Sequence, residues 1–78
     1  MSAKNMLSPA QCRAGRALLD MNQGALASAA SVSKSVIVDF ENGHRIPNRN
    51  NLAAIQHALE KAGVQFTDGG VRLKNESE

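Results

Sequence analysis

Few side chains of this 78-residue sequence can bind a metal, form a disulfide or fill a large core, because it has one cysteine, two histidines, two phenylalanines and no tryptophan or tyrosine. A single cysteine excludes an internal disulfide, and with only two histidines there is no cluster of metal ligands at the usual spacing. Alanine supplies much of the apolar fraction. We therefore expect a small core in which helices pack closely, with Cys12 as a small buried residue.

Long apolar runs are also missing. No segment reaches the ~18 residues of a membrane span, and Met1–Leu7 lacks the apolar centre of a signal peptide. A soluble, cytoplasmic protein is the expectation. A chain of this length forms one domain whose core is only marginally sufficient, so oligomerisation would help it. The net charge of +2 permits nucleic-acid binding without requiring it.

Arrangements typical of enzymes are missing as well. No cysteine–histidine or serine–histidine–acid set stands at a suitable spacing, and no glycine-rich loop could hold a phosphate. We expect neither catalysis nor a cofactor. His57 is expected on the polar face of a helix, in solvent.

The first helix has three start signals in Ser8-Pro9-Ala10-Gln11: an N-cap serine, a proline in the first position and a glutamine that completes a capping box. They predict a helix from Pro9 to about Met21. Its buried arc consists of Cys12, Gly15, Leu18 and Leu19, with Gly15 leaving room for a neighbouring backbone. Residues 1–7 are predicted to be a disordered tail, with Leu7 packing against the first turn.

Two short helices follow, separated by a tight turn. Asn22 caps a helix over Gln23–Ala30, which buries Leu26, Ala27 and Ala30. Ser33 caps the next, and Gly43 ends it with a positive φ. At 100° per residue this second helix buries an arc of Val36, Ile37 and Phe40. Short helix, turn and short helix are the layout of a helix-turn-helix.

The end of the chain contains a longer helix and a hairpin. Pro47 prevents helix at Ile46, and either Asn48 or Asn50 caps a helix that runs to Ala62. This helix buries Leu52, Ile55, Leu59 and Ala62, and Gly63 ends it. Residues 64–74 alternate apolar and polar around Asp68-Gly69, which predicts a β-hairpin. Residues 75–78 are predicted to be disordered.

A helix-turn-helix can read DNA because its second helix fits the major groove, where exposed side chains reach base edges. The candidates for base contacts are Lys34, Ser35, Val38 and Asp39. Lysine can donate to guanine, valine can pack on a thymine methyl, and aspartate can accept from cytosine. The candidates for contacts to the DNA backbone are Gln23, Asn42, His44, Arg45 and Arg49. From the pattern alone, these side chains fit the solvated faces of a helical bundle equally well, and His44 could be a plain loop histidine.

The sequence resembles the Xre, or lambda-repressor-like, family of helix-turn-helix regulators. The resemblance covers residues 8–62 and rests on Arg16, Gln23, Leu26-Ala27, Val32-Ser33, Ile37, Glu41-Asn42-Gly43 and Pro47. It implies an all-α bundle of four to five short helices, here followed by the short hairpin. It also implies that Gln23 and the four base-contact candidates touch DNA, and that Arg16 and Glu41 form a buried ion pair. The sequence departs from the family at Ser31, where glycine is frequent, and at Gly24-Ala25.

The resemblance implies a transcriptional regulator of double-stranded DNA, and a homodimer that reads a palindromic operator would present one helix to each half-site. The apolar face of the hairpin is the candidate dimer contact, formed by Val64, Phe66, Val71 and Leu73. The hairpin could instead fold back over the helices. An alternative function is a protein-binding antiactivator or antitoxin on the same scaffold, since fold does not fix function.

Overall fold

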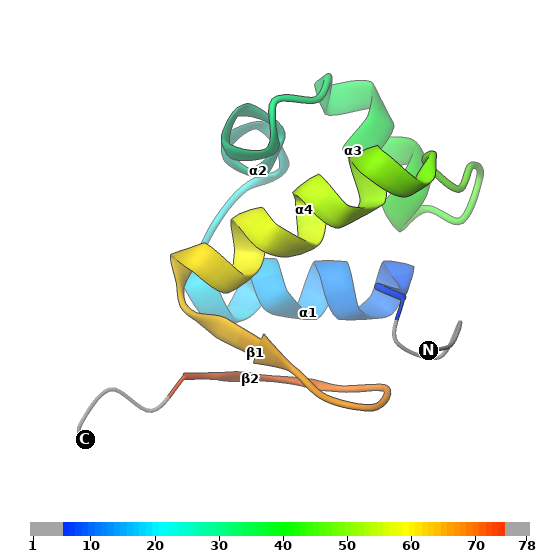
Figure 1. Ribbon diagram of the computed structural model, residues 1–78. Coiled ribbons are helices and arrows are strands. Elements are labelled where there is room, and N and C mark those ends of the chain that lie inside the picture. Colours follow the sequence, from blue (N-terminus) through cyan, green and yellow to red (C-terminus); the bar gives the residue numbers. More distant parts are fainter. Residues whose placement is uncertain (1–5, 75–78) are drawn as a thin grey trace.

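Four helices and a two-stranded antiparallel sheet make up residues 6–74, the part of the chain that this computed structural model describes (Figure 1). The elements are α1 (Pro9–Leu19), α2 (Gln23–Ala30), α3 (Lys34–Glu41), α4 (Arg49–Ala62), β1 (Val64–Phe66) and β2 (Val71–Leu73). The predicted bundle and hairpin are confirmed. The tails predicted to be disordered lie outside the described residues, except for Met6 and Leu7. Leu7 is only 5% exposed and belongs to the core.

Every helix begins at a polar side chain that accepts a hydrogen bond from the first turn. Ser8 and Gln11 form a reciprocal capping box, with distances of 3.0 Å and 2.9 Å. Asn22 accepts from the main-chain N–H of Ala25 at 2.7 Å, and Ser33 starts α3 in the same way. Asn48, not Asn50, caps α4. These bonds satisfy N–H groups that have no partner within the helix.

Two helices end on non-glycine residues in the left-handed conformation. Asp20 ends α1 with φ 55°, and Ser31 ends α2 with φ 59°. The prediction that the first helix continues to Met21 is therefore wrong, because the backbone turns at Asp20. Gly43 follows α3 with φ 79°, as expected for a glycine after a helix C-terminus.

The core lies between the four helices and the hairpin. Its fully buried side chains include Leu26, Ile37, Phe40, Ile55 and Leu59. Two predictions of burial are wrong: Leu18 is 42% exposed, and Ala62 is also exposed. Leu18 lies at the edge of the α1 arc, and Ala62 is the last residue of α4. Val36 is half-buried at the margin of the core. No helix in the described part of the chain combines the length and the apolar character needed to cross a bilayer.

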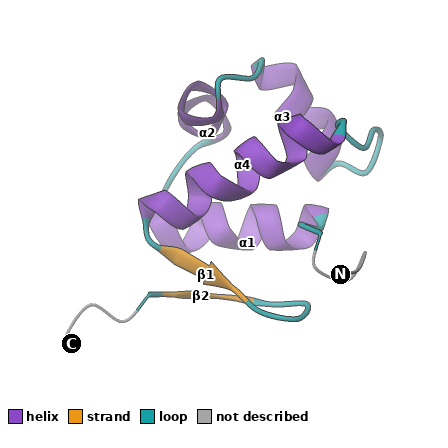
Figure 2. Cartoon of the chain, viewed as in Figure 1, coloured by secondary structure: helices purple, strands orange, loops and turns teal. Residues whose placement is uncertain are grey.

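The hairpin folds back along α1, on the side away from α2 and α3 (Figure 2). Val64 pairs with Leu73 and Phe66 with Val71. Val64 is fully buried in the core, Phe66 and Val71 pack against it, and Leu73 remains 52% exposed. Most of the apolar face that we predicted to contact a second subunit therefore covers the helices of its own chain, and Val64 is not available to a partner.

A buried glutamine fastens the hairpin to the first helix. Gln11 is 7% exposed, and its Nε2 donates to the main-chain oxygens of Thr67 and Gly70, each at 3.0 Å. The same side chain accepts from the N–H of Ser8 through Oε1. The oxygen and the nitrogen of the amide thus both have hydrogen-bond partners within the protein, and these bonds hold the turn of the hairpin at the N-terminal end of α1.

Candidate nucleic-acid interface

Among residues 6–74, only one side of the third helix is covered. Ile37 and Phe40 face the core with exposed fractions of 0% and 2%. Lys34 and Ser35 are exposed, and Val38 and Asp39 are half-buried. At 100° per residue these four side chains share one side of α3. The four predicted base-contact residues are therefore brought together on a surface that remains accessible to a ligand.

The start of this helix carries an additional contact between hydroxyl groups. The Oγ of Ser35 lies 3.1 Å from the Oγ of Ser33, which also accepts from the N–H of Val36 at 3.4 Å. The side chain of Ser35 is therefore anchored at the N-cap, while Lys34 beside it is exposed.

At the other end of α3, the carboxylate of Glu41 is buried and fully hydrogen-bonded. Glu41 is 3% exposed, and Arg16 holds it with two bonds, Nη2 to Oε1 at 2.6 Å and Nε to Oε2 at 2.8 Å. Cys12 donates its thiol to Oε2 at 3.0 Å, and Gln23 donates its Nε2 to Oε1 at 3.1 Å. The geometry contains the Arg16–Glu41 pair that the family resemblance implied, and the buried pair joins α1 to α3.

The hydrogen bonds within this cluster favour the charged forms of Glu41 and Arg16. Burial alone raises the pKa of Glu41, but hydrogen bonds from Arg16, Cys12 and Gln23 outweigh it and hold that pKa below its ordinary value. The bond to Glu41 raises the pKa of Arg16. Burial, and then the bond to Glu41, raises the pKa of the Cys12 thiol far above its usual range. Cys12 is thus a neutral donor, and its part in the cluster was not predicted from the sequence.

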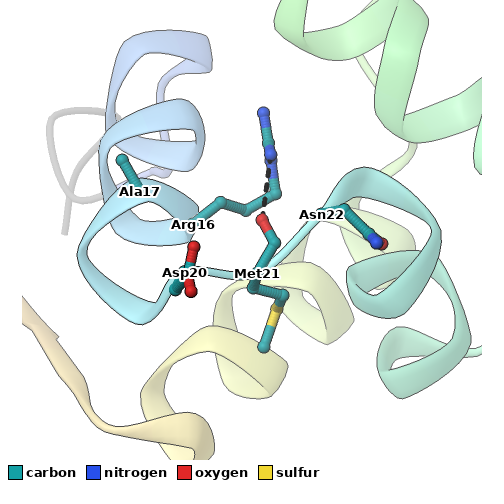
Figure 3. Close-up of a pocket in the computed structure, with 5 residues that line it drawn as sticks. All are labelled: Arg16, Ala17, Asp20, Met21 and Asn22. Carbon is teal, nitrogen blue, oxygen red and sulfur yellow. Dashed lines mark hydrogen bonds between the residues drawn. The ribbon is translucent and has the colours of Figure 1, made fainter.

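Two arginines of α1 also hold main-chain oxygens near the interface. Arg16 Nη1 donates to the oxygen of Met21 at 3.0 Å, in the turn before α2 (Figure 3). This bond lies at a shallow hollow lined by Arg16, Ala17, Asp20, Met21 and Asn22. Arg13 Nη1 donates to the main-chain oxygen of Glu41 at 2.5 Å. The sequence contained no signal for this role of Arg13, because the contact depends on how α1 and α3 pack.

The predicted backbone contacts divide into two groups. Asn42, His44, Arg45 and Arg49 are all exposed, in the loop after α3 and at the start of α4. Gln23 is half-buried at the first position of α2, and one N–H of its amide is committed to Glu41. The loop also leaves Ile46 78% exposed, an apolar residue that was not among the predicted contacts. Within residues 6–74, no three His, Cys, Asp or Glu side chains converge in a way that could hold a metal ion.

Comparison with known proteins agrees with this geometry. The sequence profile of the Helix-turn-helix family matches residues 13–64. The chain belongs to this family. Among solved structures, the fold is similar to the DNA-binding domain of the P22 c2 repressor, with a TM-score of 0.63 and 33% identity over 72% of this chain and 75% of that one. No curated protein sequence matches the chain. The family that the sequence resembles is thereby confirmed.

Proposed function

We propose that this protein is a transcriptional regulator that binds double-stranded DNA in a sequence-specific manner. The observation that carries the proposal is α3, a helix that the buried Arg16–Glu41 pair fixes at its C-terminal end and whose side with Lys34, Ser35, Val38 and Asp39 is open. The P22 c2 repressor domain, to which the fold is similar, is a DNA-binding domain. A helix held in this way can enter the major groove without shifting relative to the other helices.

Base contacts come from the open side of α3. Lys34 donates to the O6 and N7 of guanine, and Val38 packs against a thymine methyl group. Asp39 accepts from the N4 of cytosine, and Ser35 bonds to a neighbouring base edge. The exposure of Lys34 and Ser35, together with the partial exposure of Val38 and Asp39, supports these roles.

Contacts to the DNA backbone flank this helix. Gln23 and the N-terminal N–H groups of α2 bind a phosphate on one side, because a helix N-terminus favours an anion. Asn42, His44, Arg45 and Arg49 bind phosphates on the other side, where all four are exposed. Such contacts fix the orientation of the protein, while the bases provide specificity.

We also propose a homodimer that reads a palindromic operator with one α3 in each half-site, about 34 Å or a multiple of it apart. Leu73 and the accessible parts of Phe66 and Val71 are the hairpin surface that remains for a partner. Truncating the hairpin would remove Val64 from the core, so a point change is the better probe. Leu73→Glu should convert the dimer to a monomer in sedimentation equilibrium, with Lys74→Glu as a neighbouring control.

Selection from a library of random duplexes, followed by sequencing, tests the proposed function. At moderate salt we expect the protein to enrich a two-fold symmetric site, and Lys34→Ala to change the preferred bases. The partly acidic open side of α3, which includes Asp39, could instead contact a protein. Enrichment of no sequence at all would favour that alternative, an antiactivator or antitoxin, over DNA binding.

A further inference from the structure

One buried carboxylate connects the start of α2 with the end of α3. Glu41, the last residue of α3, accepts a hydrogen bond from Gln23, the first residue of α2, at 3.1 Å. Arg16, its ion-pair partner, also holds the main-chain oxygen of Met21, two residues before Gln23. The ion pair therefore fixes both the backbone that enters α2 and the first side chain of that helix.

We propose that Glu41 is a positioning residue for DNA binding, which acts by holding the amide of Gln23 so that its second N–H faces a DNA phosphate. The inference rests on the proposed function, because it needs the phosphate contact of Gln23. It adds that the phosphate contact and the base-reading helix are set relative to each other by a single carboxylate.

The chemistry of the two side chains fixes the orientation of the amide. An ionised carboxylate only accepts hydrogen bonds, so the nitrogen of the Gln23 amide, and not its oxygen, must face Glu41. An amide nitrogen carries two hydrogens, and Glu41 takes one of them. The second hydrogen remains available for a phosphate, and the amide that carries it is already oriented before DNA binds. Such preorganisation lowers the entropic cost of binding.

The carboxylate is itself held rigidly. Arg16 binds both of its oxygens and Cys12 donates to one of them, while Glu41 as a whole is 3% exposed. Every buried polar side-chain atom among residues 6–74 has a hydrogen-bond partner, and both oxygens of this carboxylate are bonded from more than one side. A fixed carboxylate fixes Gln23, whereas a flexible surface acid would not.

A double-mutant cycle on DNA affinity tests the proposal, with a duplex that the wild-type protein has selected from a random library. Gln23→Met removes both amide donors at nearly constant shape, and Glu41→Asp keeps the charge but shortens its reach by one methylene. We expect each single change to weaken binding about five-fold, the worth of one ordinary hydrogen bond. Glu41→Asp should have little further effect once Gln23 is methionine. Gln65→Met, the same exchange on the exposed hairpin, is the matched control and should bind like the wild type.

A second measurement separates positioning from a general weakening of the fold. Gln23 is neutral, so Gln23→Met should leave the salt dependence of binding unchanged, whereas Arg45→Ala should reduce the log–log slope by about 1. Circular dichroism at the binding temperature confirms that each variant is folded. If Glu41→Asp is not folded, the side-chain amide of Gln23 in the wild type replaces the cycle: in NMR it should be as rigid as the backbone and shift when the duplex is added.

The outcomes distinguish this inference from the proposed function. Additive effects in the cycle, wild-type affinity of Gln23→Met, or a mobile Gln23 amide would overturn the positioning role and leave DNA binding intact. A wild-type protein that selects no duplex would overturn the proposed function, and with it the phosphate contact.

Discussion

The side-chain nitrogen of Gln11 lies 3.0 Å from the main-chain oxygen of Gly70, a residue 59 positions later in the chain. A second bond of 3.0 Å joins the same nitrogen to Thr67. One amide thus completes the capping box of α1 and also holds the turn of the hairpin, which links the two ends of the described chain.

Replacing Gln11 by glutamate should separate these two roles. The carboxylate of the Gln11→Glu variant would retain the acceptor for the N–H of Ser8, but it would lose both donors and place a charge beside two carbonyl oxygens. We expect this exchange to lower the free energy of unfolding by roughly 1–3 kcal/mol, the cost of disrupted buried hydrogen bonds. Urea denaturation measures this change. Gln65→Glu is the control: Gln65 is exposed and bonds to Arg72, so its exchange should change stability little.

The buried carboxylate of Glu41 should make the fold sensitive to acid. Its pKa is lower in the folded chain than the ordinary value of about 4.3 that holds in the unfolded chain. The resulting stabilisation is fully present above that value, and it is lost as the pH falls through the lower, folded pKa. In Glu41→Gln this part of the pH dependence should vanish, and stability at pH 7 should fall by about 3 kcal/mol or more.

Chemical denaturation between pH 7 and pH 3 measures both effects of Glu41→Gln. Arg16→Lys is the companion variant, because it keeps the positive charge and loses the two-pronged geometry. It should destabilise the protein and still show the acid transition. A Glu41→Gln variant with the same pH dependence as the wild type would contradict this account of the pair.

Ser31 offers a simple route to a more stable protein. It ends α2 in the left-handed region, with φ 59°, where a side chain costs about 1–2 kcal/mol and glycine avoids that cost. Ser31→Gly should therefore raise the free energy of unfolding by about 1 kcal/mol, after allowing for the greater flexibility of glycine when unfolded. Ser28→Gly, the same exchange inside α2, should lower it by about 0.5 kcal/mol. A thermal melt of each variant compares them directly.

Gly15 should tolerate a methyl group, contrary to the expectation that a neighbouring backbone comes close to it. The nearest atoms to an added Cβ would be Phe66 Cζ at 3.5 Å and two methyl carbons of Leu59 at 3.7 Å, which are ordinary contacts. Gly15→Ala should stabilise α1 by up to about 1 kcal/mol. In contrast, Gly43→Ala should be destabilising, because Gly43 has φ 79°. Differential scanning calorimetry of both variants would test this difference in sign.

Substitutions on α3 and in the loop after it should affect DNA binding in different ways. Asp39→Ala should relax the preference at one base pair of each half-site by roughly 1–3 kcal/mol. Arg45→Ala should weaken binding to all sequences alike if Arg45 contacts only phosphate, as we propose. Competition between the selected duplex and its single-base variants measures both. An Arg45→Ala variant with altered base preference would assign Arg45 to the groove instead.

Local signals predicted most of the fold. The capping side chains Ser8, Asn22 and Ser33, and the glycines after α3 and α4, act within a few residues of their own position and could be read from the sequence. The positions of the four base-contact candidates on α3 follow from the periodicity of a helix and could also be predicted from the sequence.

What could not be predicted depends on contacts between distant segments. Gln11 is buried because the hairpin packs over it, whereas Leu18 stays 42% exposed at the edge of the buried arc of α1. Arg13 reaches the end of α3 only once α1 has packed beside it. The apolar face of the hairpin had two possible destinations, and Val64 and Phe66 pack against the helices of their own chain while Leu73 stays exposed.

The bonds from Gln11 to the hairpin turn also constrain the order in which the chain can acquire its structure. They join residues 56 and 59 positions apart, whereas α2 and α3 meet across a turn of three residues. Contacts between neighbouring segments form early, and distant ones form late because closing a long loop costs more entropy. During synthesis at the ribosome, the capping glutamine is made long before its partners. The two hydrogen bonds from Gln11 can therefore form only after the hairpin turn has been synthesised.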